Sequence, residues 1–269
     1  MSRTVVMPIL LAAGALPLAA QMPAALQQER SAYAEWLASS PTSPFRAVAQ
    51  QPIGPGIRIG VGGDLPLEGV AGQISEQDGS VFLQAERDKR TLPRHRPVAL
   101  GRYTVVAGGT TGRAVLTVFD SATASRAPAY FDYDPTLVFL GPLLPAATPR
   151  TQRLLAPDGI EVEATEAGSV LVSVGGTQTR LQVMRIPDPA SGESELELFF
   201  RDSTNLDGTY PAGRFVSLIP AGGGRYRLDF NRARNPFCAY SSAYACPAPW
   251  RGNALPLAVR AGEKYRPLK

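Results

Sequence analysis

Polar and charged side chains gather near the carboxyl end of the sequence, between segments with the alternation typical of β-strands. The members that we expect to contact a ligand are Arg214, Asp229, Asn231, Arg232, Asn235, Glu263 and Lys264. A planar guanidinium beside amide side chains suits a carboxylate or a phosphate, so one interpretation is a site for a small polar or anionic ligand or for a partner. The other interpretation is structural: these groups exchange hydrogen bonds that fix a proline-rich loop, because prolines offer carbonyls but no N–H.

The same segment also contains carboxylates that could do chemistry. Asp229 and Asn231 alternate with Leu228 and Phe230, which predicts a strand with both polar side chains on one face. Asp202, Asp229 and Glu263 are the acids that a carboxylate-dependent hydrolase or lyase would use, if the fold sets them at a suitable separation. Such an enzyme is the alternative to a binding protein, and the sequence does not identify a catalytic residue.

The amino-terminal residues 1–20 have the pattern of a secretory signal peptide. Arg3 precedes an apolar run that ends in small residues at Ala19 and Ala20. Prolines interrupt the run, and it is shorter than the roughly 20 residues that span a bilayer, so a retained membrane helix is the weaker alternative. We therefore expect a periplasmic or secreted protein with no transmembrane segment after cleavage.

Cys238 and Cys246 are the only cysteines of the chain. In an exported protein they predict a disulfide that closes a short, proline-flanked loop. A metal site would need further ligands, and a nucleophilic cysteine would need a base, for which the one histidine, His95, lies far away in the sequence. We expect neither a metal nor a cofactor.

The charges of the chain are nearly balanced, with 27 basic and 23 acidic residues, which does not indicate nucleic-acid binding. One basic run surrounds His95 and contains Arg87, Lys89, Arg90, Arg94 and Arg96. We expect it to be a long solvated hairpin loop; the alternative is a patch that contacts anionic surfaces. A catalytic role for His95 is not expected, because the neighbouring cations disfavour its charged form.

Hydrophobic periodicity predicts an amphipathic helix over residues 23–39, within an amino-terminal helix and linker at 21–45. The pattern then changes to period two, which predicts strands at 57–61, 80–86, 98–107 and 113–120, with a hairpin turn at 108–112. Three prolines within 141–149 suggest a boundary between β regions at 46–149 and 150–269. The expected fold is all-β, a sandwich or partly open barrel, with one amino-terminal helix.

Several ordered motifs lie between Phe199 and Tyr265. They are F-x-D-x-T at 200–204, T-Y-x-x-G-R-F at 209–215, L-D-F-N-R-A at 228–233, N-P-x-C-A at 235–239, C-P at 246–247 and A-G-E-K at 261–264. In these motifs the sequence resembles the bacterial and archaeal family called domain of unknown function 1684. The resemblance implies a shared fold but no established activity. Arg234 stands where the family usually has an aromatic residue, and Phe237 replaces a second proline.

Overall fold

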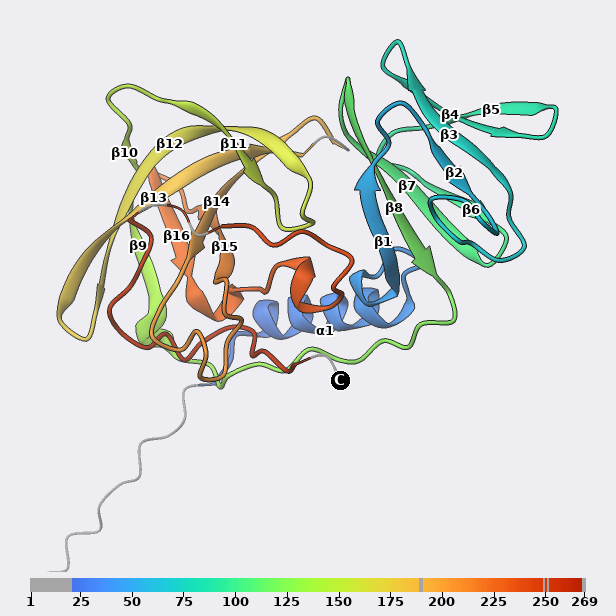
Figure 1. Ribbon diagram of the computed structural model, residues 1–269. Coiled ribbons are helices and arrows are strands. Elements are labelled where there is room, and N and C mark those ends of the chain that lie inside the picture. The colour runs from blue at the N-terminus through green and yellow to red at the C-terminus, as the bar shows by residue number, and fades with distance from the viewer. Residues whose placement is uncertain (1–20, 189–190, 249, 251, 268–269) are drawn as a thin grey trace, which may run out of the picture.

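The structure, a computed structural model, describes residues 21–188, 191–248, 250 and 252–267. The predicted signal peptide at 1–20 lies outside the described residues. The described chain is mostly β-structure with a single α-helix near its amino terminus, which confirms the predicted fold class. Figure 1 shows a smaller β region beside a larger one, with helix α1 below the larger region.

Helix α1 spans Ala24–Ser39, as the periodicity predicted. Leu26 and Leu37 are its buried residues, and Tyr33 and Trp36 stack on each other with ring centroids 5.7 Å apart. Ser40 adopts an extended conformation because a proline follows it, and this ends the helix. The helix therefore presents an aromatic face that is available for packing against the larger β region.

The smaller region contains two four-stranded antiparallel sheets, with strand orders β1-β8-β7-β6 and β2-β3-β4-β5. Their strands are β1 (Ala47–Pro52), β2 (Ile57–Ile59), β3 (Gly72–Gln77), β4 (Ser80–Ala85), β5 (Asp88–Leu92), β6 (Pro97–Leu100), β7 (Tyr103–Thr110) and β8 (Arg113–Asp120). One apolar cluster, which includes Ile74, Leu83 and Leu116, fills the space between the sheets.

Two predictions for this region need correction. The predicted strand at 98–107 is two strands, β6 and β7, because Gly101 adopts a positive φ of 60° and turns the chain. The basic run, expected to be a solvated loop, contains strand β5, which pairs with β4 along its whole length. The hairpin predicted at 108–112 is confirmed: β7 pairs with β8, and Thr111 and Gly112 form the turn.

The larger region is a nearly closed barrel with the strand order β10-β12-β13-β14-β15-β16-β9, to which β11 adds by pairing with β12. Its strands are β9 (Val138–Pro142), β10 (Leu144–Pro145), β11 (Thr151–Leu155), β12 (Glu161–Val174), β13 (Thr177–Pro187), β14 (Ser194–Phe200), β15 (Arg214–Pro220) and β16 (Arg225–Asp229). Strands β9 and β10 are nearly continuous and pair with β16 and β12 respectively, so the sheet starts before the predicted boundary at Pro149.

Strands β14 and β15 separate two packed layers. Leu198 and Val216 point into the barrel and join its core, whereas Phe199 and Phe215 pack with Trp250 on the outer face. A bulge between Glu166 and Gly168 changes which side chains of β12 point into the barrel. Val162 and Ala164, before the bulge, therefore pack in the outer layer, and Val170 and Val172, after it, pack in the barrel core. The outer face of the barrel is therefore a second packing surface, and α1 lies next to it.

Candidate functional site

A cavity of about 680 Å³ lies between helix α1 and the outer face of strands β14 and β15. This volume falls within the range of roughly 300–1,000 Å³ typical of small-molecule sites. Part of the lining is apolar, with contributions from α1, the barrel and the short 3-10 helix η4 (Phe237–Ala239). It includes Leu26, Tyr33, Trp36, Ile186, Ile219 and Phe237. The lining also contains charged residues, among them Glu29 and Arg30 of α1 itself, so the cavity suits a molecule with an apolar and a polar part.

Glu197 is the most deeply buried charged residue of the cavity wall, with only 2% of its surface exposed. Its Oε1 atom accepts hydrogen bonds from Arg234 Nη2 at 2.8 Å and from Ser217 Oγ at 2.5 Å. Its Oε2 atom has no donor among the described residues. Burial raises the pKa of Glu197, while the positive charge of Arg234 opposes that shift. The Oε2 atom of Glu197 could therefore still accept a hydrogen bond, which no described residue donates.

Glu195 lies two residues before Glu197 on β14, and its carboxyl interacts with that of Glu197 as well as with Arg234, 3.9 Å away. Its side chain is 61% exposed, whereas that of Glu197 is almost fully buried. The two carboxyls therefore form a pair that runs from the cavity mouth to its interior, with Arg234 beside both.

Two further arginines line the cavity, and both contact neighbouring groups. Arg30 of α1 donates to the carbonyl of Asn231 at 2.9 Å and lies 4.2 Å above the ring of Tyr130. Arg232 pairs with Glu29 at 3.0 Å and with Asp229 at 3.5 Å. These contacts also fasten α1 to the barrel. Asp158 also lines the cavity, and burial raises its pKa to about 6.

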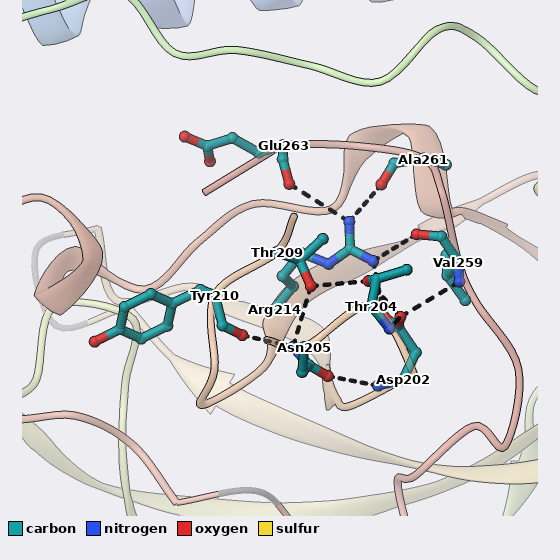
Figure 2. Close-up of polar contacts among 9 residues, drawn as sticks. All are labelled: Asp202, Thr204, Asn205, Thr209, Tyr210, Arg214, Val259, Ala261 and Glu263. Carbon is teal, nitrogen blue, oxygen red and sulfur yellow. Dashed lines mark hydrogen bonds and ion pairs between the residues drawn. The ribbon is translucent and has the colours of Figure 1, made fainter. Parts of the chain in front are cut away.

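Arg214, the predicted ligand-binding arginine, lies away from this cavity at the centre of a buried cluster (Figure 2). Its side chain is 0% exposed and pairs with Asp202 at 2.8 Å. It also donates to the carbonyls of Val259, Ala261 and Glu263. Desolvation lowers the pKa of Arg214, and Asp202 counters that effect. This geometry is that of a structural clamp that fixes the carboxyl-terminal segment against the barrel.

Asp229 and Asn231 do not share a strand face, contrary to the prediction. Strand β16 ends at Asp229, whose Oδ1 accepts from the backbone N–H of Asn231 and so caps a short 3-10 helix, η3 (Phe230–Arg232). Asn231 exchanges two hydrogen bonds with the backbone of Asp134, at 2.9 and 2.8 Å. Asn231 and Arg232 nevertheless line the cavity, and they are the predicted ligand-binding residues that do so.

Asn235, Glu263 and Lys264 border a separate hollow of about 20 Å³, which has room for a single water molecule. The Glu263 carboxylate accepts from the backbone N–H of Asn235 at 2.9 Å and from the hydroxyl of Tyr240. Tyr240 in turn lies 3.1 Å from the hydroxyl of Tyr33 on α1. Burial raises the pKa of Glu263 to about 7. These residues therefore connect α1, the loop between Cys238 and Cys246, and the carboxyl-terminal segment.

The predicted disulfide between Cys238 and Cys246 is absent: both residues are free thiols. The hydroxyl of Tyr210 lies 3.2 Å from Cys238 Sγ and 3.1 Å from Cys246 Sγ, and the two cysteine side chains also interact with each other by a hydrogen bond. Burial raises the pKa of Cys238 to about 12, whereas Cys246 is exposed.

The basic run is spread over several environments. Arg94 is mostly buried and pairs with Glu76, and Lys89 lies over the ring of Phe82. Arg87, Arg90 and Arg96 are exposed. His95 has a positive φ of 57° and lies near Gly108, and burial lowers its pKa. The smaller region therefore leaves three exposed arginines for the anionic contact that the sequence suggested.

Sequence reasoning missed Glu195, Glu197 and Trp36 as cavity residues. The segment Ser194–Phe200 does alternate acidic and apolar residues, which signals a strand with both glutamates on one face. The missing information was that α1 covers this face. Among the described residues, no group of three or more His, Cys, Asp or Glu side chains is placed to hold a metal ion. None of the helices in the described ranges is long and apolar enough to cross a bilayer.

The fold and site define a β-barrel protein with a helix-covered cavity on its outer wall. Residues 126–264 match the family described as protein of unknown function (DUF1684), and the chain belongs to this family. It is also similar to an uncharacterised protein of Haloarcula marismortui solved by solution NMR, with 32% identity over 52% of this chain and 76% of that one, and a TM-score of 0.44. No curated protein matches the chain.

Proposed function

We propose that this protein binds a small amphipathic molecule in the cavity between α1 and strands β14 and β15. The observation that carries the proposal is the Glu197 carboxyl, which is buried on the cavity wall and has one oxygen without a donor among the described residues. Burying a charged group that lacks full hydrogen bonding is costly, so a bound polar group would stabilise this arrangement. The aromatic side chains of α1 would cover the apolar part of the ligand.

The alternative, a carboxylate-dependent hydrolase or lyase that uses Asp202, Asp229 and Glu263, has less support. Asp202 is paired with Arg214, Asp229 caps η3, and Glu263 accepts hydrogen bonds from Asn235 and Tyr240. Each carboxylate thus already has a structural role. The signal-like pattern of residues 1–20 supports export, and we propose that the ligand is met in the periplasm or outside the cell.

Isothermal titration with octan-1-ol, a neutral amphipathic probe, tests the cavity. We expect the wild-type protein to bind it and the Ile219→Trp variant to lose binding, because the larger ring would fill space beside β15. Leu171→Trp is the matched control, since Leu171 is 44% exposed and does not line this cavity. Equal binding by the wild-type and Ile219→Trp proteins, with both folded, would refute the proposal.

Trp36 offers a second readout, because it lines the cavity while the other tryptophan, Trp250, packs on Phe199 and Phe215. Octan-1-ol should change the fluorescence of the wild-type protein. The Trp36→Phe variant should still bind the alcohol in the calorimeter but show a much smaller fluorescence change. An unchanged signal in this variant would place the alcohol away from α1.

A further inference from the structure

The charges of the cavity indicate which polar group the ligand carries. Its described lining contains five carboxyl side chains, those of Glu29, Asp158, Asp188, Glu195 and Glu197, and three guanidinium groups, those of Arg30, Arg232 and Arg234, for a formal charge of −2 (3 − 5). Attraction of cations into a partly enclosed, negatively charged space is favoured by its low-dielectric walls.

The arginines of the cavity are already engaged with acceptors or acids. Arg234 donates to Glu197, and Arg232 pairs with Glu29 and Asp229. Arg30 faces a backbone carbonyl and the negative face of an aromatic ring. Among the described residues, the Nε atoms of Arg30 and Arg232 have no hydrogen-bond acceptor, but the contacts above compensate the charge of each guanidinium. An anion entering here would have to compete with them.

The carboxyl groups of the cavity, by contrast, include an oxygen without a hydrogen-bond donor in the described part of the chain. Glu197 Oε2 has no donor among the described residues, and Glu195, its neighbour on β14, is itself an acid. One proton shared by the two carboxyls, or a positively charged donor from a ligand, would relieve their repulsion. An ammonium group supplies both a positive charge and several N–H donors, and its hydrogen bonds to a carboxylate are charge-assisted.

We propose that the cavity selects a hydrophobic amine, whose ammonium group binds between Glu195 and Glu197 and whose apolar chain lies against Trp36 and Ile219. The proposal rests on the proposed function and names the ligand class of the same site. The aromatic rings of Tyr33 and Trp36 would also favour a nearby cation through their π-faces.

Titration calorimetry with three probes of equal chain length tests this selectivity: octylamine, octan-1-ol and octanoate, at neutral pH. We expect octylamine to bind about tenfold more tightly than octan-1-ol, and octanoate to bind most weakly, because one charge-assisted hydrogen bond is sufficient for a tenfold preference. A preference for octanoate, or equal affinity for the amine and the alcohol, would overturn the amine proposal but leave the cavity as a binding site. Failure of all three probes to bind would overturn both proposals.

The Glu197→Gln variant sharpens the test, since it removes the charge and keeps the shape. It should lose most of the amine preference, so that its affinities for octylamine and octan-1-ol differ by no more than about twofold. If this variant does not fold, Glu195→Gln serves instead, because Glu195 is largely exposed, and it should lose part of the preference. Glu68→Gln, on an exposed side chain of the smaller region, is the charge-matched control and should keep the wild-type preference. Wild-type amine preference in a folded Glu197→Gln protein would overturn the assignment.

Discussion

The two β regions differ in what they bury. Up to Asp120, the buried polar side chains are Ser43, Thr117 and Asp120. In the larger region they are Glu197, Asp202, Thr204, Asn205, Thr209, Arg214, Asp229, Asn231, Asn235, Asn253 and Glu263. The smaller region thus has an apolar core between sheets, and the larger one adds a polar network to its apolar core.

The difference shows two ways to fix a β-structure. Apolar packing is non-directional, whereas a buried polar network holds its members in one geometry when all are hydrogen-bonded. The side chain of Asn253, for example, accepts a hydrogen bond from the backbone N–H of Gln182 and donates to the carbonyls of Gln182 and Phe199. The cavity lies on the region with the directional network, which is where a binding site benefits from fixed walls.

The largest expected effect is at Arg214. Replacing it in Arg214→Met leaves Asp202 buried without its partner, so we expect a loss of about 3–5 kcal/mol in the free energy of unfolding. Urea denaturation measures it. Arg58→Met, which removes an exposed ion pair of the smaller region with Asp64, should leave the midpoint almost unchanged. The double variant Arg214→Met/Asp202→Leu should recover part of the loss; similar midpoints for Arg214→Met and the wild type would contradict the clamp.

A buried glutamate of the larger region, Glu263, should make the free energy of unfolding depend on pH. Glu263 has a folded-state pKa of about 7, raised by burial from 4.5, so its contribution to stability is fully present below about pH 4.5 and is lost as pH rises through about 7. The shift corresponds to about 3 kcal/mol as an order of magnitude. Urea unfolding at pH 5 and pH 8 should show this loss in the wild type and a smaller one in Glu263→Gln. The same pH dependence in both proteins would show that other groups cause it.

The cysteines give the smallest effect on stability. A thiol reagent should modify exposed Cys246 quickly at pH 8 and Cys238 at least about 100-fold more slowly, because Cys238 is buried with a pKa of about 12. Tyr210→Phe should cost about 1 kcal/mol or less, since it removes one hydroxyl that meets both sulfurs. Mass analysis of unreduced protein should find two thiols, and a disulfide in freshly purified protein would contradict the structure.

Local sequence patterns predicted several of the elements but not the site. The spacing of Leu26, Tyr33 and Trp36 predicted α1, and period-two alternation predicted β8. The polar cluster around Arg214 was recognised, but its partners could not be identified, because Asp202 and Val259 approach it only through tertiary folding. The cavity was missed for the same reason, because the local pattern of Ser194–Phe200 carries no information about packing against a helix some 160 residues earlier in the chain.

Helix α1 lies outside the segment that matches the family, residues 126–264, yet it forms the aromatic side of the cavity, while Glu195, Glu197 and Arg234 lie inside that segment. The two halves of the pocket can therefore diverge separately. Exchanging the helix alone would change the size and shape of an accepted molecule while its preferred charge stayed the same. A recombinant fragment limited to the matched residues would contain Glu195 and Glu197 but lack the helix surface on which the apolar end of the proposed ligand would lie.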